Sequence, residues 1–249
     1  MVFSANGLAV VVLIASTLAT PDGDGKMKPD TLAAFEAYVA DVRGAFLVAD
    51  HTGSTPATPG AIVKVSGGLV HHWTGAIEIP GVGLDDVLAV SQDYDRYAEV
   101  HTPVRQSQLI ERDGNRFRIR MRMKSDAGPL SAVLDVWSTV TYLATGRGMR
   151  VLSETRNVRQ LDSEEQPAGL PPPVGRESGN FWAANTFTSF EPVAGGVRVE
   201  LVTVGLSRRF PRLLGWLIEP FARRLGRSSA ERTLEEFRAA VLRAHPTDK

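Results

Sequence analysis

The last fifth of the chain most constrains its fold, because a helix pattern there follows a long region of strand patterns. Leu234, Phe237 and Val241 recur at steps of three and four, which places them on one face of a helix. Such a helix must bury its apolar stripe, and nearly everything in residues 69–206 has strand character. The sequence therefore predicts an α+β fold in which one long C-terminal helix lies across a curved antiparallel sheet.

The order of the other elements supports this architecture. Alternating apolar residues predict an opening strand over residues 62–79. Helical spacing with a break near Asp93 predicts two short helices in residues 84–100. Six strands follow, with hairpin turns at Asp113-Gly114 and Gly195-Gly196.

Residues 1–20 are expected to be a signal peptide. Residues 7–19 are uncharged and apolar, and Thr17 and Ala19 stand at the minus-three and minus-one positions of a cleavage site. The run is too short to span a membrane comfortably, which needs about 20 apolar residues. The prediction is export to the periplasm or the outside of a bacterium; the alternative is a buried N-terminal strand or helix.

Residues 21–60 are expected to form an N-terminal helix and a linker that precede a main domain at 61–249. The helix would start with Asp30 or Thr31 as its cap. Its apolar stripe would contain Leu32, Phe35, Val39, Val42 and Phe46. This helix is predicted to dock on the main domain or, alternatively, on a partner.

Composition excludes several classes of function. The formal net charge is zero, so no global charge attracts the chain to nucleic acid. There is no cysteine, which removes thiol nucleophiles and thiolate metal sites. His71, His72 and His101 lack the spacing of a metal site, and we expect neither a metal nor a cofactor.

Two segments carry local similarity to a known superfamily. WTGAIEIPG followed by DDVLAVSQDYDRY, and LSRRFPRLLGWLIEPF before SSAERTLEEFRAAV, resemble the first and last elements of START / Bet v 1 / polyketide-cyclase (SRPBCC) domains. The resemblance covers residues 69–244 and implies a helix-grip fold, in which the sheet wraps the C-terminal helix around a cavity for lipids, sterols, hemes or polyketides. The whole chain also resembles exported bacterial proteins that carry this domain. No catalytic motif accompanies the resemblance.

Five aromatic residues are candidates to line such a cavity, because aromatic side chains supply large contact area with few rotamers. They are Tyr94, Tyr97, Trp137, Phe187 and Trp216. The alternative is that they fill the core, since cores and apolar pockets use the same side chains.

A stripe of arginines marks one face of a predicted strand and comprises Arg116, Arg118, Arg120 and Arg122. It could bind an anionic head group through bidentate contacts. We favour a solvated outer face that pairs with acids such as Asp135 or Glu154.

Carboxylates near the tyrosines offer a second chemistry. Asp93, Asp95 or Glu99 could act as a general base if buried, although an aspartate at the start of a short helix is more often a cap. The chain has no G-x-S-x-G elbow, Walker loop or Rossmann fingerprint.

Residues 209–225 have basic pairs on either side of an apolar helix with Trp216, a layout compatible with transient membrane contact or with a cavity wall. Pro220 would kink this helix. A further helix would start after it, with Ser228 or Ser229 as its cap.

The leading functional hypothesis is a binder or carrier of a hydrophobic, lipid-like small molecule, held between the sheet and the C-terminal helix. Residues 209–225 or the proline-rich loop 162–179 would open its entrance. The alternatives are a cyclase- or aromatase-like enzyme that uses Tyr94, Asp93 or Asp95, and a protein-interaction module with no cavity.

Overall fold

The structure is a computed structural model that describes residues 27–49, 61–127, 130–173, 179, 181–208 and 215–246. Within these ranges, the side chains of 125–127, 130, 131 and 215–228 are not described. The expected signal peptide and nearly all of the linker lie outside the described residues. No helix in the described ranges is long and apolar enough to cross a membrane.

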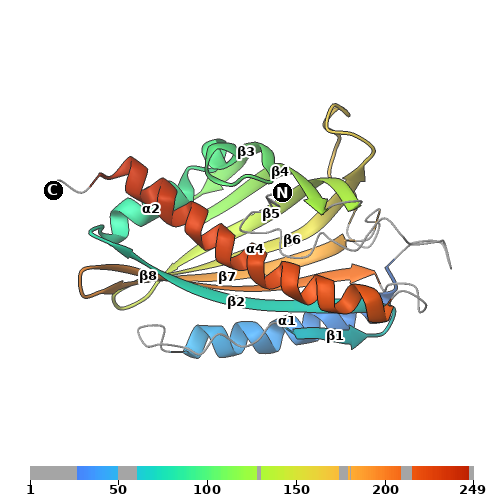
Figure 1. Ribbon diagram of the computed structural model, residues 1–249. Coiled ribbons are helices and arrows are strands. Elements are labelled where there is room, and N and C mark those ends of the chain that lie inside the picture. Colours follow the sequence, from blue (N-terminus) through green and yellow to red (C-terminus); the bar gives the residue numbers. More distant parts are fainter. Residues whose placement is uncertain are drawn as a thin grey trace.

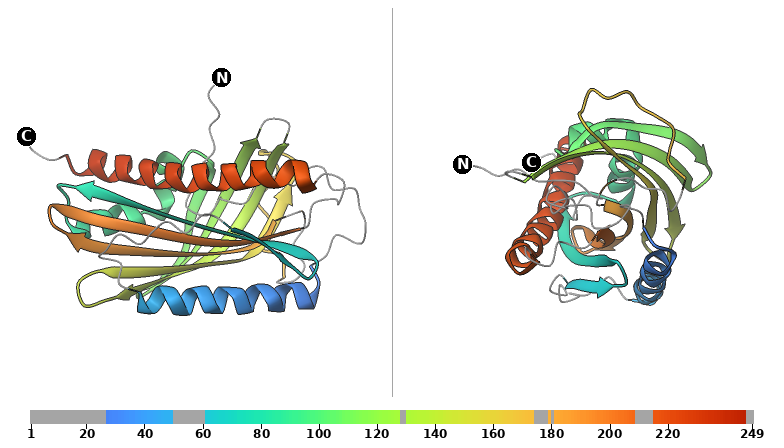
Figure 2. Two further views of the ribbon diagram at one scale, coloured as in Figure 1. Left: turned by 60° about the horizontal axis from the view of Figure 1, so that its bottom comes forward. Right: turned by 90° about the vertical axis from the view of Figure 1, so that its right-hand side faces the viewer.

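One antiparallel sheet of eight strands forms the body of the protein (Figure 1). Its strands are β1 (Ala61–Val65), β2 (Gly68–Pro80), β3 (Val104–Asp113), β4 (Arg116–Ala127), β5 (Leu130–Ala144), β6 (Met149–Leu161), β7 (Phe181–Val193) and β8 (Gly196–Arg208). Their order is β1-β2-β8-β7-β6-β5-β4-β3. The first long strand therefore pairs with the last, and the sheet curves around the helix on its concave side (Figure 2).

The predicted opening strand is a hairpin, which the sequence pattern did not separate. β1 and β2 pair through a turn at Ser66-Gly67, where Gly67 has a φ of 72°. Glycine adopts this left-handed conformation without the steric cost that a Cβ imposes. The two strands continue the same alternation, and only the glycine pair between them marks the turn.

The concave face of the sheet is covered by α4 (Gly215–Ala244), which runs diagonally across it (Figure 1). The predicted stripe is confirmed, because Leu234, Phe237 and Val241 are buried. α4 approaches β2 closely at Gly75, where an added Cβ would lie 2.9 Å from a methyl carbon of Leu234. This contact explains why a glycine interrupts the larger apolar residues on that face of β2.

The prediction of two separate helices near the C terminus is wrong, because α4 is continuous across Pro220 and Ser229. Ser229 is buried within the helix and does not cap its start. A serine inside a helix costs less than about 1 kcal/mol relative to alanine. Burial of the apolar stripe outweighs so small a preference.

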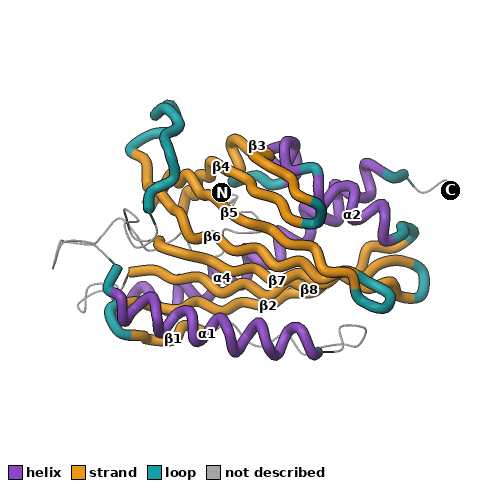
Figure 3. Tube along the Cα trace, turned by 180° about the vertical axis from the view of Figure 1, so that it is seen from behind, coloured by secondary structure: helices purple, strands orange, loops and turns teal. Residues whose placement is uncertain are grey.

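The convex face is partly covered by α1 (Pro29–Val48), which begins with a proline at its first position (Figures 2 and 3). Its buried side chains include Phe35, Val39 and Phe46, which pack against residues of β2, β7 and β8. Arg150 of β6 donates hydrogen bonds to the carbonyl oxygens of Leu47 and Ala49 at the end of the helix. Of the two predicted docking modes, the structure shows α1 on the main sheet.

A short helical segment closes one end of the concave side. It comprises α2 (Leu84–Gln92), the 3-10 turn η2 (Tyr94–Arg96) and α3 (Tyr97–Val100), which confirms the predicted break near Asp93. η2 and α3 contact β3, and α2 contacts α4. The segment therefore lies over the β3 edge of the sheet, while α4 packs mainly on β2.

Candidate ligand cavity

A small cavity lies between the short helical segment and strands β4 to β7. Its walls come from both sides and comprise Ser91, Tyr94, Tyr97, His101, Val104, Ile119, Met121, Met123, Val140, Tyr142, Val151, Ser153, Thr186, Thr188 and Phe190. The space open to the centres of water molecules is about 50 Å³. This is room for a few waters, since one water needs about 10–15 Å³ by this measure.

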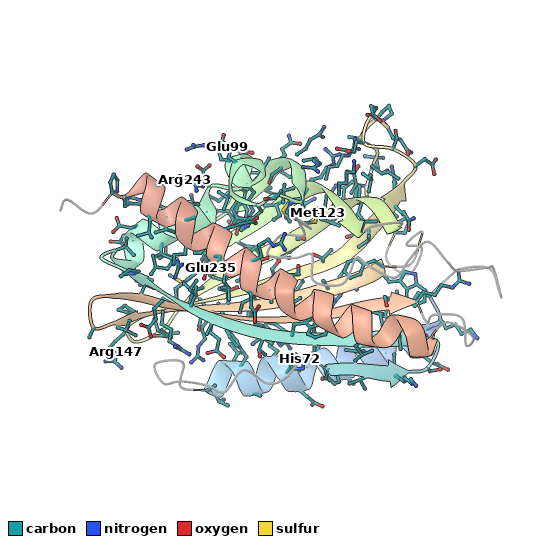
Figure 4. All side chains as sticks on the ribbon, in the orientation of Figure 1. His72, Glu99, Met123, Arg147, Glu235 and Arg243 are labelled. Atoms are coloured by element: carbon teal, nitrogen blue, oxygen red, sulfur yellow. The ribbon has the colours of Figure 1, made fainter. Side chains whose placement is uncertain are left out.

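The cavity does not lie between the sheet and the C-terminal helix, where the ligand was expected from the sequence. The described residues of α4 do not line it, because α4 packs on β2 while the short helical segment covers the same concave face nearer its β3 edge. Figure 4 shows Met123, one of the lining residues, on β4 at the concave side of the sheet. The helix still reaches the wall of the cavity through Glu236, as described below.

The polar groups of the cavity form a hydroxyl cluster. The hydroxyl of Tyr142 lies 2.8 Å from that of Tyr94 and 2.9 Å from that of Ser91. Both Tyr142 and Tyr97 donate to the backbone carbonyl oxygen of Ser91, at 2.9 Å and 2.5 Å. These bonds tie α2 and α3 to β5 at the end of the cavity.

The tyrosines of this cluster are neutral. Burial is the largest cause that raises the pKa of Tyr94 and of Tyr97 well above 10, and it raises the pKa of Tyr142 to about 12. A phenol with so high a pKa stays protonated near neutral pH and does not act as a base there. It can donate or accept hydrogen bonds.

The imidazole of His101 forms another part of the wall. Its side chain is 1% exposed, and its ring packs edge-on against Tyr97 with centroids 5.3 Å apart. Its Nδ1 faces the carboxylate of Glu236 on α4, with 3.8 Å between Nδ1 and Oε2. Glu236 also accepts a hydrogen bond of 2.7 Å from the hydroxyl of Thr102.

Glu236 is ionised in this setting. Burial on its own raises the pKa of its carboxyl group, but the interactions with His101 and Thr102 outweigh burial and leave the pKa below its usual value. A negative charge therefore faces the Nδ1 side of His101, outside the cavity.

The five predicted ligand-binding residues are not brought together. Tyr94 and Tyr97 line the cavity. Phe187 lies on the opposite face of β7, because its neighbours Thr186 and Thr188 point into the cavity and successive strand residues alternate. Its ring packs on Phe46 of α1, with centroids 5.6 Å apart.

Trp137 also lies on the convex face, where the guanidinium carbons of Arg120 and Arg159 are 6.0 Å and 5.9 Å from its ring centre. The side chain of Trp216 lies outside the described residues. Sequence reasoning missed Tyr142 and considered His101 only as a metal ligand. The sequence could have placed Tyr142 on the inner face, because it lies two residues after Val140 on β5 and alternate strand residues share a face.

The arginine stripe faces outward, and its pairing with Asp135 is confirmed. Asp135 is fully buried and accepts hydrogen bonds from Arg122 at 2.8 Å and 2.9 Å and from Arg120 at 2.9 Å. The expectation of a solvated face is wrong for Arg122, which is 3% exposed. Glu154 does not join this group and lies 3.9 Å from Arg43 of α1.

The buried ion pair has a cover, which the sequence did not predict. The proline-rich loop folds over it, and Arg122 donates to the carbonyl oxygens of Glu164 and Gln166, both at 2.7 Å. Asn157 holds the loop further along through the carbonyl oxygen of Pro172, at 2.6 Å. Residues 162–173 therefore lie on the convex face and not at the cavity, which contradicts the expectation that this part of the loop is a gate.

The candidate general bases do not enter the cavity. Asp93 and Glu99 lie 3.6 Å and 2.7 Å from the guanidinium of Arg96. Asp95 accepts a hydrogen bond of 2.8 Å from the backbone N–H of Leu109. The bond of Asp95 joins the short helical segment to β3, while the contacts of Asp93 and Glu99 stay within that segment. Asp93 stands at the N-cap position of η2, but its side chain makes no capping hydrogen bond.

The histidine pair divides between the two faces, as strand alternation requires. His71 is buried with its Nε2 2.7 Å from the hydroxyl of Ser207, and His72 lies 3.0 Å from the hydroxyl of Tyr38 on α1. Across the described ranges, no cluster of three metal-ligating side chains is present.

The curved sheet, the helix across its concave face and the short helices that close one end define a helix-grip fold, as found in START and Bet v 1-type (SRPBCC) proteins. A STAR-related lipid transfer protein from Xanthomonas axonopodis is similar over 74% of this chain and 99% of its own, with 16% identity and a TM-score of 0.50.

Further solved structures have lower scores. Human StAR-related lipid transfer protein 5 has 16% identity and a TM-score of 0.45, over 86% of this chain and 98% of its own. The Zhui aromatase/cyclase from Streptomyces has 14% identity and a TM-score of 0.47, over 70% and 93%. No family model and no curated protein sequence matches the chain.

Proposed function

We propose that this protein binds a hydrophobic, lipid-like small molecule in the cavity between the short helical segment and strands β4 to β7. The observation that carries the proposal is the wall of this cavity, which is mainly apolar and has no carboxylate among its described lining residues. The printed names of the structural neighbours, lipid transfer proteins and an aromatase/cyclase, are consistent with a ligand of this class.

Binding would be driven by removal of apolar ligand surface from water, and each buried methylene contributes about 0.8 kcal/mol. The cavity must enlarge to admit such a ligand, because typical ligand sites occupy about 300–1,000 Å³. Met121 and Met123 line it, and methionine side chains are unbranched and adapt their shape easily. The short helices α2 and α3 could move outward as a further adjustment.

The test is native mass spectrometry of the full chain expressed in a bacterial host, followed by organic extraction of co-purifying molecules. We expect a stoichiometric apolar ligand on the wild-type protein. Ser153→Phe, which fills the cavity, should remove it, while Thr141→Phe on the opposite face of β5 should retain it. Empty wild-type protein that also ignores fluorescent lipid probes would overturn the proposal.

A second candidate is a cyclase- or aromatase-like enzyme. It is favoured by the imidazole of His101 in the cavity wall, which faces the carboxylate of Glu236, together with three tyrosine hydroxyls. Neither Asp93 nor Asp95 would take part, because neither lines the cavity and each contacts another group. Turnover of an extracted ligand by the wild-type protein, and its loss in His101→Gln, would favour the enzyme over the carrier.

Transient membrane contact through residues 209–225 and export of the mature protein complete the proposal. Basic pairs on either side of an apolar segment support the contact, and the apolar run at residues 7–19 supports export. Cosedimentation with anionic vesicles, compared between the wild type and a variant with Arg223 and Arg224 changed to glutamine, tests the contact. N-terminal sequencing of protein recovered from the periplasm or medium tests the export.

A further inference from the structure

The hydroxyl cluster of the cavity has no hydrogen left to donate. Tyr142 and Tyr97 each have one hydroxyl hydrogen, and both are used by the carbonyl oxygen of Ser91. Since Tyr142 donates there, it accepts from the hydroxyls of Tyr94 and Ser91 at 2.8 Å and 2.9 Å. Lone pairs of these oxygens remain, so the cluster offers acceptors to a ligand.

His101 adds an acceptor of a different kind. Among the described residues, neither nitrogen of its buried ring has a hydrogen-bond partner. The carboxylate of Glu236 faces Nδ1 at 3.8 Å and attracts the ring proton to that nitrogen. The Nε2 atom then keeps an unused lone pair on a residue of the cavity wall, and an unsatisfied polar group in such an apolar setting costs about 1–3 kcal/mol.

We propose that the ligand of this cavity is a neutral hydrophobic molecule with a hydroxyl group, and that this hydroxyl donates a hydrogen bond to Nε2 of His101. The inference rests on the proposed function and specifies the chemical class of its ligand. A phenol, a sterol-like alcohol or a long-chain alcohol has the required group. The bond satisfies the buried imidazole and orients the ligand with its polar end toward α3.

Other classes of ligand fit less well. A ketone or an ether needs a donor, which neither the hydroxyl cluster nor Nε2 of His101 provides; at this end of the cavity only a hydroxyl on the ligand can supply the hydrogen, and the remaining hydroxyl donors, among them Ser153 and Thr188, lie on the facing strands. A carboxylate or phosphate needs a cation, and no lysine or arginine is among the described residues that line the cavity. The charge on Glu236 would also repel an anion held at His101.

The binding test compares 2-naphthol, which donates a hydrogen bond, with 2-methoxynaphthalene, which cannot. Titration of the full chain with each probe, followed by calorimetry or probe fluorescence, gives the two affinities. We expect naphthol to bind about tenfold more tightly, the factor that one buried hydrogen bond supplies. His101→Phe should abolish this preference. The control His72→Phe should retain it, because His72 lies on the convex face of the sheet beside Tyr38 of α1.

The outcomes separate the two proposals. Equal affinity for both probes in the wild type, or an unchanged preference in a folded His101→Phe variant, overturns the hydroxyl inference and leaves hydrophobic binding in place. Absence of binding by either probe, together with an empty protein in the extraction experiment, overturns both. Thermal unfolding of each variant identifies any that fail to fold.

A measurement on the wild-type protein needs no variant. Nitrogen-15 NMR of the imidazole rings distinguishes a protonated from an unprotonated ring nitrogen. We expect the Nε2 of His101 to carry no proton in the free protein and its resonance to shift with 2-naphthol but not with 2-methoxynaphthalene. A proton on Nε2 in the free protein would overturn the inference.

Discussion

Replacement of Asp135 by asparagine isolates the contribution of the buried charge on the convex face. The side chain keeps its shape, but Arg122 and Arg120 lose the carboxylate that accepts their three hydrogen bonds. Arg122 is 3% exposed, so water cannot replace the lost partner without displacing the loop that covers it. The variant therefore leaves an uncompensated charge inside the protein.

Removal of one partner from a buried ion pair costs about 3–5 kcal/mol. For a domain of this size, 1 kcal/mol corresponds to about 2–4 °C, so the midpoint of thermal unfolding should fall by at least about 6 °C. Urea unfolding at pH 7, followed by circular dichroism, measures the change in free energy. Glu111→Gln is the matched control, because it breaks the exposed pair with Arg118 and should cost less than about 1 kcal/mol.

The difference in stability between the wild type and Asp135→Asn should also depend on pH. Burial raises the pKa of Asp135, but the hydrogen bonds from Arg122 and Arg120 outweigh burial and hold it below its usual value. A lowered folded-state pKa gives stability that is complete above about pH 4, the value for an unfolded aspartate, and that is lost as the pH falls further. A difference between wild type and Asp135→Asn below 1 kcal/mol at pH 7, or one that grows toward pH 3, would refute the reasoning.

Three further variants test other contacts. Gly75→Val should destabilise the fold by about 1–3 kcal/mol in urea because the new side chain meets α4, while Gly146→Val, in open space, should not; equal effects would contradict the close approach. Burial lowers the pKa of His71 to about 3, so below pH 6.5 the unfolded chain binds a proton that the folded protein does not. The free energy of unfolding should therefore fall by about 1.4 kcal/mol for each pH unit below 6.5, and His71 should add no pH dependence above it. His71→Gln should flatten this slope, and parallel slopes would count against a neutral ring. Arg150→Met should speed amide exchange at the end of α1, whereas unchanged exchange would show that its carbonyl contacts are dispensable.

Most of the fold followed from periodicity, because the sheet and α4 bury long regular stripes. The stripe of Leu234, Phe237 and Val241 and the break near Asp93 were both predictable from local spacing. The turn at Gly67 was not predicted, because the apolar residues of β1 and β2 look like one continuous alternating pattern in the sequence. The continuity of α4 through Ser229 was missed because tertiary burial overrides a weak local preference.

The cavity was less predictable than the fold. Aromatic type alone does not give the face of a strand, so Phe187 and Trp137 were expected in the cavity although both lie on the convex side. Strand alternation assigns each residue of β5 and β7 to a face only once one residue, such as Val140 or Thr188, is known to point to the concave side. The contact between His101 and Glu236 joins two elements that are far apart in the chain, and no local pattern contains it.

The pairing of β2 with β8 has a consequence for the order of folding. The first long strand of the sheet finds its partner only when the last one is available, and the surface that receives α1 is built from β2, β7 and β8 together. Contacts between such distant segments slow folding, because a large loop must close before they form. A growing chain therefore cannot complete its sheet until nearly all of it has been made, and a truncation before Gly196 leaves β2 without its partner and α1 without much of its docking surface.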